Sequence, residues 1–441
     1  MRGARGDAPS RLERLRRSVA RLTRAGVVAL LPLLLLLILV TYLLPERQDD
    51  EAGYLELARN LGDGFYATGR PDALLDEDPS YPDLWFGPGL PLVLVAPVAA
   101  GLPLELVRLT GPLFLFGALL VFHAVLRRSL PRRAALAATW ALGLYLPFYS
   151  VLPNLHSEPL AIFLVAVAMY ALARLAVEDD RRWVFLGAFA LAGLALTRVA
   201  YGWVLTIGLA AFLVWWLATR ARFPGRLAVT AALALAFCVP WLAYTTVETG
   251  RLLQWGNSGA LSLYWMSASA EGLHGDWRQA DDVFTDPRLA SERPFFASLR
   301  GVELPEQNAR LEARALRNIA EHPDAYAGNV AANVSRLFFD APYSDGETRS
   351  ATLAFAVPNA ILLALVATSL VLLRRRRTAL PAVVLPFAVL AMLAFGLHAL
   401  VAAYPRMLLP IVPLAVFFVA TTLTAPRGRT RGAHATNQAC R

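Results

Sequence analysis

The sequence lacks lysine altogether and contains only two cysteines among its 441 residues. All 42 basic residues are therefore arginines, which together with frequent Ala and Leu is typical of a GC-rich bacterial genome. Cys238 lies in an apolar stretch and Cys440 in the C-terminal tail, so we predict no disulfide in an outer loop. A Walker loop, a GxGxxG motif and a spaced set of Cys and His are also missing. These absences argue against a nucleotide-binding or zinc-binding site.

Charged residues are scarce as well, at 17% of the chain, whereas 57% of the residues are hydrophobic. This balance excludes a disordered chain and an ordinary soluble globule. A membrane-spanning helix needs about 20 apolar residues, because only a helix pairs all of its own backbone amides in hydrocarbon. We therefore predict an all-α polytopic membrane protein with ten spans, the fifth and sixth divided within LTRVAYG. The stretches are 26–45, 104–126, 134–152, 158–177, 183–197, 199–218, 227–247, 351–373, 378–401 and 406–424.

The net charge of +9 could indicate a nucleic-acid partner, but its distribution argues against one. The termini and the short Arg-rich loops hold 26 arginines and five acids, a net +21, whereas the remaining 16 arginines and 28 acids give −12. By the positive-inside rule, both termini are cytoplasmic and the loops 46–103 and 248–350 lie outside the cell membrane. No small-residue cleavage site follows the first apolar stretch, so we interpret it as an uncleaved anchor.

These assignments divide the chain into five parts. They are a basic cytoplasmic N-terminus (1–25), a seven-helix transmembrane module (26–247) with a first outer loop (46–103), an outer loop domain (248–350), a three-helix transmembrane module (351–424) and a basic tail (425–441). The second outer loop is long enough to form a small, mainly helical domain. Its segment EQNARLEARALRNIAEHPDAYAGNVAANVSRLFF predicts one amphipathic helix that ends before Pro323 and a second helix after it.

The first outer loop begins with three adjacent acids, Asp49, Asp50 and Glu51, followed by a helical pattern of apolar residues that starts at Tyr54. The pattern predicts a short amphipathic helix on the membrane surface. Charged groups beside hydrocarbon lose solvation, so the acids are either costly or functional, or they form a solvated turn. They could also hold a divalent metal. The next segment, FGPGLPLVLVAP, is apolar but short and rich in Pro, and we predict that it is re-entrant or interfacial.

Four further polar residues lie at the outer ends of predicted spans: His156 and Glu158 in PNLHSEPL, Arg198 in LTRVAYG and Arg406 in YPRMLLPIVP. A helix N-terminus stabilises an anion, so an ordinary cap would also explain Glu158. The arginines could extend their side chains to the interface. A guanidinium is also the side chain best suited to bind a phosphate near lipid headgroups. If both arginines face one cavity, they form a site for a phosphate whose lipid tail stays in the bilayer.

The order of six segments resembles the GT-C class of membrane glycosyltransferases, and within it the family-39-like proteins typified by protein mannosyltransferases and lipid A aminoarabinose transferases. The segments are DDEAGYLELARNL, FGPGLPLVLVAP, HSEPL, LAGLALTRVAYG, EHPDAYAGNVAANVSRLF and YPRMLLPIVP. The resemblance implies a GT-C-like bundle that uses a polyprenyl-phosphate sugar on the outer membrane face and inverts the anomeric centre. It implies that Asp50 is the general base or holds the acceptor, with Glu51 beside it and Asp49 as an alternative register. Glu158 matches the second acid and Arg406 the arginine before the last helix.

Two departures from the family pattern are present. The usual doubled proline is replaced by Gly87-Pro88-Gly89, and the usual Arg-Tyr pair by Arg406-Met407.

We therefore predict a glycosyltransferase that moves a sugar from a polyprenyl phosphate to a glycan, lipid or protein acceptor in the cell membrane. The predicted catalytic residues are Asp50, Glu51 and Asp49, and the predicted substrate-binding residues are Glu158, His156, Arg198, Arg406 and Tyr54. The partners are the lipid donor, the acceptor and membrane lipids, and no cofactor is required because the sugar is already activated.

A transporter or flippase for a lipid-linked or anionic substrate is the main alternative. Transporters are often built from repeated halves, whereas the loop 248–350 has no counterpart in the first half. A non-enzymatic scaffold, the third hypothesis, predicts no pocket that joins Asp50 to the arginines.

Overall fold

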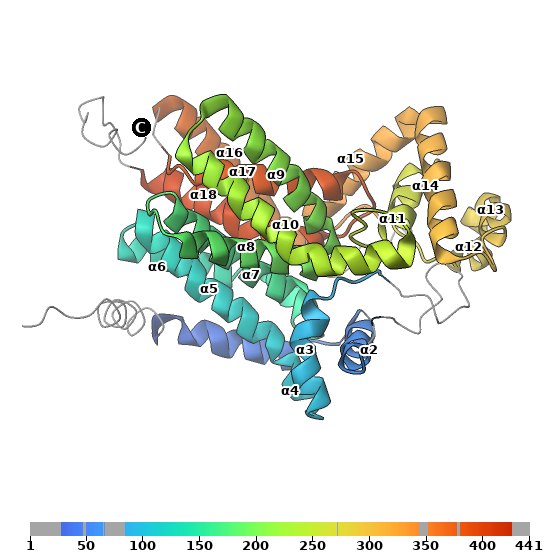
Figure 1. The fold of residues 1–441 in the computed structure, drawn as a ribbon, viewed down its shortest axis with the longest axis horizontal. Helices are drawn as coiled ribbons and strands as arrows, with labels where there is room; N and C mark the ends of the chain where they lie inside the picture. The colour runs from blue at the N-terminus through green and yellow to red at the C-terminus, as the bar shows by residue number, and fades with distance from the viewer. Residues whose placement is uncertain are drawn as a thin grey trace, which may run out of the picture.

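The computed structural model describes residues 28–46, 50–64, 66, 84–270, 272–343, 352–376 and 380–425. Within these ranges the chain is helical and forms no β-strand (Figure 1), which confirms the predicted all-α membrane bundle. Asp49 lies outside the described residues.

Six helical segments in the described ranges are long and apolar enough to cross a membrane. They are Leu104–Ser129 (α4, Leu104–Arg108, and α5, Thr110–Ser129), α7 (Glu158–Leu175), α9 (Val199–Thr219), α10 (Arg222–Thr249), α16 (Thr352–Arg376) and Pro405–Thr424 (η4, Pro405–Ile411, and α18, Val412–Thr424). Shorter helices complete the bundle: Val28–Leu43, α6 (Arg132–Gly143), α8 (Arg181–Thr197) and α17 (Val384–Ala399). In α7, 72% of the apolar window is buried, against 11% in α16. The helix that begins with Glu158 is therefore the enclosed centre of the bundle.

Proline and backbone conformation decide where several helices break. The stretch predicted as one helix at 134–152 forms α6 and then η2 (Leu146–Val151). Pro147 lacks the amide hydrogen that would donate to the Gly143 carbonyl, so the α-helix ends at Gly143. The long apolar block around LTRVAYG is divided at Arg198, whose extended backbone (φ −136°, ψ 107°) ends α8 and begins α9. This break places a single arginine between two apolar helices.

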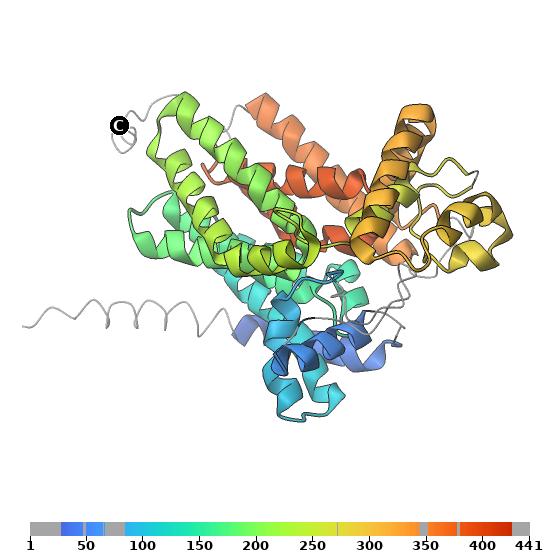
Figure 2. The same cartoon turned by 45° about the vertical axis from the view of Figure 1, so that its right-hand side comes forward.

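The first outer loop contributes two short helices at one end of the bundle (Figures 1 and 2). The amphipathic helix α2 (Glu51–Gly62) packs on α3 (Gly89–Ala99), which is formed by the proline-rich apolar segment. With 11 residues, α3 is about 16 Å long and too short to cross a hydrocarbon core of about 30 Å.

A group of helices after α10 forms a separate core beyond the same end of the bundle (Figure 2). Its helices are α11 (Gly259–Ser267), α12 (Asp282–Thr285), η3 (Pro287–Glu292), α13 (Arg293–Ala297) and α14 (Leu304–Glu321). The next helix, α15 (Pro323–Phe339), packs Leu337 against Ala399, Ala403 and Leu408 of the last membrane segments. We call α11 to α15 the outer domain, after the side of the membrane that the charge pattern predicts. Its centre is aromatic, with the rings of Trp265 and Phe296 stacked at 5.4 Å between centroids. The break between α14 and α15 falls at His322, directly before Pro323.

Candidate active site

The side chain of Asp50 leaves its own helix and contacts a distant arginine. Asp50 occupies the N-cap position of α2, where an aspartate normally accepts a hydrogen bond from a backbone amide of the first turn, but no such bond forms. Its Oδ2 instead lies 2.8 Å from Nη2 of Arg406. A local capping role is thus replaced by a contact between the first outer loop and the last membrane segment.

Arg406 lies in the first turn of η4 and connects three polar groups. Besides Asp50, its Nη1 lies 2.8 Å from Nδ1 of His156, and its Nε lies 3.9 Å from Oε1 of Glu158. Because a guanidinium only donates hydrogen bonds, Nδ1 of His156 accepts this one. The histidine therefore supports the orientation of Arg406.

Glu158, the first residue of α7, holds the second arginine of the cluster. Its Oε1 lies 2.5 Å from Nη1 of Arg198, which is also 3.3 Å from Oγ of the Ser157 side chain. Its other oxygen, Oε2, is buried and has no hydrogen-bond partner. This oxygen lies 3.9 Å from Nδ1 of His156, so it keeps capacity to accept a hydrogen bond. The four residues Asp50, Glu158, Arg198 and Arg406 form one connected set, which we call the polar cluster.

Exposure divides the polar cluster into an accessible pair and a buried pair. The side chains of Arg406 and Asp50 are 23% and 26% exposed, whereas those of Arg198 and Glu158 are 12% and 1% exposed. Two carboxylates and two guanidinium groups balance in charge. A ligand that approaches from solvent would therefore meet Asp50 and Arg406 first, with the Glu158–Arg198 ion pair behind them.

Glu51, the neighbour of Asp50, has entirely different partners. Its two carboxylate oxygens accept hydrogen bonds from Nη2 and Nε of Arg108 at 2.7 and 2.9 Å, and Oε2 also accepts the Leu155 amide at 2.9 Å. Arg108 also pairs with Glu46. This buried array fastens α2 to α4 and to the loop before α7, so Glu51 holds the frame of the site.

Sequence reasoning missed Arg108. The only sequence feature that could have indicated it is the presence of a charged residue near the start of the predicted span 104–126.

Tyr54 lies one helical turn after Asp50 on the buried face of α2. Burial raises the pKa of its phenol, and the negative charges of Asp50 and Glu158 raise it further. The hydroxyl is therefore protonated at neutral pH and keeps a hydrogen to donate. Its ring packs on Phe86 with centroids 4.5 Å apart. Tyr54 thus lies beside the polar cluster as a potential hydrogen-bond donor.

Two glycines of the first outer loop allow its close approach to the break that carries Arg198. A Cβ on Gly87 would collide with the Leu196 carbonyl, and one on Gly89 would collide with the Thr197 backbone and hydroxyl. Both contacts lie in the last turn of α8. The Gly-Pro-Gly departure noted in the sequence therefore has a steric cause: only glycine fits where α3 starts against the end of α8.

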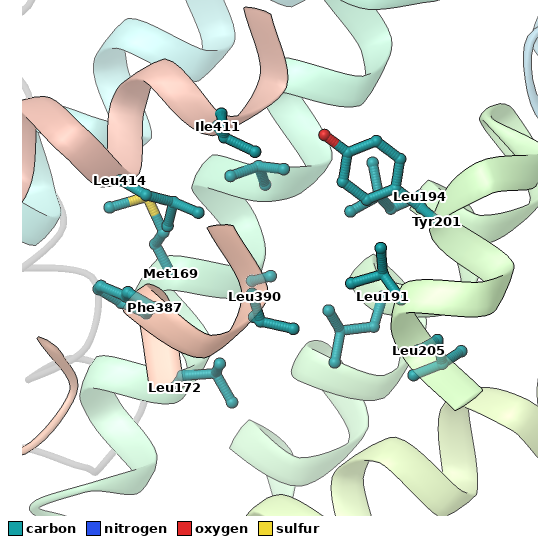
Figure 3. Close-up of a pocket in the computed structure, with 13 residues that line it drawn as sticks. Met169, Leu172, Leu191, Leu194, Tyr201, Leu205, Phe387, Leu390, Ile411 and Leu414 are labelled. Carbon is teal, nitrogen blue, oxygen red and sulfur yellow. The ribbon is translucent and has the colours of Figure 1, made fainter. Parts of the chain in front are cut away.

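An apolar cavity of about 30 Å³ lies between α7, α8, α9, α17 and the start of α18 (Figure 3). Tyr201, one turn after Arg198, lies with Ile411 at one end of this cavity. The Tyr201 hydroxyl is buried and has no hydrogen-bond partner. The cavity is far smaller than the roughly 300–1,000 Å³ of a typical ligand pocket, so it could hold a lipid chain only if the surrounding helices moved apart.

The described residues contain no group of three or more His, Cys, Asp or Glu side chains arranged to hold a metal ion. The acids of the polar cluster pair with arginines instead. Asp49, which we considered as a metal ligand together with Asp50 and Glu51, lies outside the described ranges.

Comparison with solved structures finds a similar arrangement of helices in an archaeal membrane enzyme. The apo form of the oligosaccharyltransferase from Archaeoglobus fulgidus matches with a TM-score of 0.53 and 14% identity, over 90% of this chain and 50% of that one. The same archaeal enzyme, AglB, in complex with an inhibitory peptide and a dolichol-phosphate gives 0.50 and 13% identity over the same shares. This chain thus spans about half the length of the archaeal structures.

ArnT from Cupriavidus metallidurans bound to undecaprenyl phosphate matches 90% of this chain and 77% of that one at 16% identity, but its TM-score is only 0.40. No family model and no curated protein sequence matches the chain. The archaeal likeness confirms a GT-C-like fold and says nothing by itself about the reaction.

Proposed function

We propose that this protein is an integral-membrane glycosyltransferase that moves a sugar from a polyprenyl-phosphate donor to an acceptor on the outer face of the membrane. The convergence of Asp50, Glu158, Arg198 and Arg406 carries this proposal. Four separate segments supply an accessible carboxylate and two guanidinium groups at one end of a membrane bundle. A base beside a phosphate-binding group is what transfer from a lipid phosphate requires.

In this mechanism Arg406 binds the phosphate of the donor, and Arg198, which is more deeply buried, adds positive charge on the side away from solvent. As the bond between the anomeric carbon and the phosphate oxygen breaks, its electron pair leaves with the phosphate. The phosphodiester monoanion becomes a polyprenyl phosphate that carries one more negative charge. Contacts that strengthen as this charge develops lower the barrier. The 23% exposure of Arg406 leaves it reachable from solvent.

Asp50 is the general base of the proposed reaction. The acceptor hydroxyl attacks the anomeric carbon from the face opposite the phosphate, and its proton passes to the Asp50 carboxylate. One displacement of this kind inverts the anomeric centre. The unpartnered Oε2 of Glu158 and the Tyr54 hydroxyl provide an acceptor and a donor for sugar hydroxyl groups beside the reacting carbon.

The ion pair between Asp50 and Arg406 makes donor binding a condition for catalysis. At 2.8 Å the two groups hold each other, and a sugar cannot lie between them while they do. A donor phosphate that binds Arg406 would replace the carboxylate and release Asp50 toward the acceptor. The donor therefore binds before the acceptor in this proposal.

The charge distribution supports the proposed orientation, with both termini cytoplasmic and the polar cluster at the outer face. The predicted outer parts of the chain carry a net charge of −12. They include the loop 46–103, which supplies Asp50 to the site, and the loop 248–350, which forms the outer domain.

The test is transfer by the purified full-length protein from a panel of synthetic polyprenyl-phosphate sugars in nanodiscs. The Asp50→Asn variant, which keeps the shape but removes the base, should lose activity about 10²- to 10⁴-fold. Asp63→Asn, a change of an exposed acid at the other end of α2, should leave transfer unchanged. Circular dichroism and thermal melting check that both variants fold.

Full activity of Asp50→Asn would remove Asp50 from the mechanism. If the wild-type protein transferred no sugar but moved the labelled lipid between leaflets, the flippase alternative would replace the transferase.

A further inference from the structure

Helix α15 of the outer domain presents polar side chains along one face. Tyr326, Asn329, Asn333 and Arg336 follow each other at intervals of three or four residues, which places them in one row on a helix. All four donate hydrogen bonds to backbone carbonyls within the outer domain or between the last membrane helices. Arg336 also pairs with Asp276 at 2.8 Å. The row therefore connects α15 to the backbone of the outer domain and to the backbone between the last membrane helices.

Asn333 makes the densest set of these contacts. Its side chain is fully buried, and Nδ2 lies within 3.1 Å of the carbonyls of His398, Ala399 and Val401. Its Oδ1 accepts the amide of Ala403 at 3.2 Å. One side chain thus satisfies both donor and acceptor groups in a single turn of the chain.

The turn held by Asn333 is the one that delivers Arg406. His398 and Ala399 are the last residues of α17, where helix carbonyls have no partner within the helix. Asn333 therefore caps α17 from another domain. The chain then runs from Leu400, whose carbonyl accepts the Tyr326 hydroxyl at 3.0 Å, to η4 and the Arg406 side chain. No regular helix connects α17 to η4, so the path of this segment is held by these side-chain bonds together with the bond from the Ala402 amide to the Ser262 carbonyl at 3.2 Å.

We infer that Asn333 is a positioning residue for the donor-phosphate site, and that the outer domain acts through it to place Arg406. This inference rests on the proposed role of Arg406 as the phosphate ligand. The guanidinium of Arg406 must reach Asp50, His156 and Glu158 together, so a small shift of its backbone disturbs all three contacts. Misplacement by about 1 Å can cost on the order of 10²-fold in a reaction that depends on such geometry.

Asn329 provides a matched control on the same face of α15. Its Nδ2 donates to the carbonyls of Met266 and Ala268 at 3.0 and 2.8 Å, which belong to the outer domain and its loop. Both asparagines thus bind backbone carbonyls through one amide. Of the two asparagines, only Asn333 binds the segment that leads to Arg406.

The experiment measures binding of farnesyl phosphate, which carries the phosphate but no sugar, to the full-length protein in nanodiscs. Asn333→Ala should weaken binding by about tenfold or more, as expected when a binding guanidinium is displaced. Asn329→Ala should lower the melting temperature comparably and change farnesyl phosphate affinity by less than about twofold. In transfer assays, Asn333→Ala should raise the donor KM, whereas Asn329→Ala should leave it unchanged.

A double-mutant cycle separates positioning from general damage. In a chain that already carries Arg406→Ala, the Asn333→Ala change should cause no further loss of affinity, because the group it positions is gone. Additive losses, normal binding in Asn333→Ala, or equal losses in both asparagine variants would each overturn the inference. If Asn333→Ala does not fold, Tyr326→Phe removes only the bond to Leu400 and should weaken binding about two- to fivefold. Unchanged binding in Tyr326→Phe would then count against the inference.

Failure of the proposed function gives a different pattern. Suppose that wild-type protein binds farnesyl phosphate and that the double-mutant cycle shows no further loss in the Arg406→Ala background, but that no sugar is transferred from any donor. The positioning role of Asn333 is then supported and the proposed glycosyltransferase activity is wrong.

Discussion

Two arrays of carboxylates and arginines lie next to each other in this protein, and the sequence neighbours Asp50 and Glu51 belong to different ones. In the first array, Glu51 and Arg108 are 11% and 9% exposed and bond through two nitrogens, with the Leu155 amide as a third donor. In the second, Arg406 is shared among three partners, and one oxygen of Glu158 has no hydrogen-bond partner. The saturated array fixes structure, whereas the shared one has capacity to bind a ligand.

The difference has a physical cause in the cost of burying charge. Removal of one partner of a buried ion pair leaves an uncompensated charge in the interior, which is strongly destabilising. A partly exposed pair can be solvated when it separates. The Asp50–Arg406 pair can therefore open for a ligand at low cost, and the Glu51–Arg108 pair cannot.

The largest effect on stability is expected from breaking the saturated array. Glu51→Ala should lower the free energy of unfolding by about 3–5 kcal/mol, because Arg108 is left buried without its main partner. Denaturant titration of the purified protein measures this loss. Arg310→Ala, which breaks the exposed Arg310–Glu306 pair, is the control and should cost less than about 0.5 kcal/mol.

A double variant sharpens the same prediction. Glu51→Leu combined with Arg108→Met removes both charges together and should be more stable than Glu51→Ala alone. If Glu51→Ala proved as mild as Arg310→Ala, the distinction between the two arrays would be lost.

The shared array should respond in binding rather than in stability. Arg406→Ala should weaken the affinity for a polyprenyl-phosphate sugar about 10- to 100-fold, which corresponds to about 1.5–3 kcal/mol for charge-assisted hydrogen bonds. Its unfolding free energy should fall by less than in Glu51→Ala, because Asp50 can be solvated in its absence and the buried Glu158 keeps its ion pair with Arg198. Equilibrium binding in nanodiscs measures the first quantity.

Arg59→Ala removes an exposed arginine from α2 and should leave donor affinity unchanged. Unchanged affinity in Arg406→Ala would instead favour an arginine that merely extends to the membrane interface.

The smallest effect is expected at a buried polar side chain outside both arrays, where the cost of missing hydrogen bonds can be measured. The amide of Asn257 is buried, and neither its nitrogen nor its oxygen has a hydrogen-bond partner. Asn257→Leu should therefore leave stability unchanged or raise it by up to about 1 kcal/mol. Asn318→Leu, which removes a buried amide bonded to Ser267, should lower it. Thermal melting compares the two, and a clear loss in Asn257→Leu would show that an amide without a protein partner still stabilises the fold.

Much of the fold and part of the site could be predicted from the sequence. The break within LTRVAYG was expected, and the structure places it at Arg198. The polar residues at outer helix ends were expected to face one cavity if they bind substrate, and Glu158, Arg198 and Arg406 do meet. The separation of Asp50 from Glu51 was not predictable. Consecutive residues at a helix start point in directions about 100° apart, so what each one meets depends on the packing of other segments.

The helical membrane fold follows from local features of the chain, because runs of apolar residues and the placement of arginines act over short stretches. Which acid meets which arginine depends instead on how distant segments pack. The partners in the two arrays are 57 residues apart for Glu51 and Arg108, and 250 apart for His156 and Arg406. No local pattern encodes contacts at such separations. They arise where the glycines of the first loop let α3 lie against the end of α8, and where Asn333 holds the turn before η4.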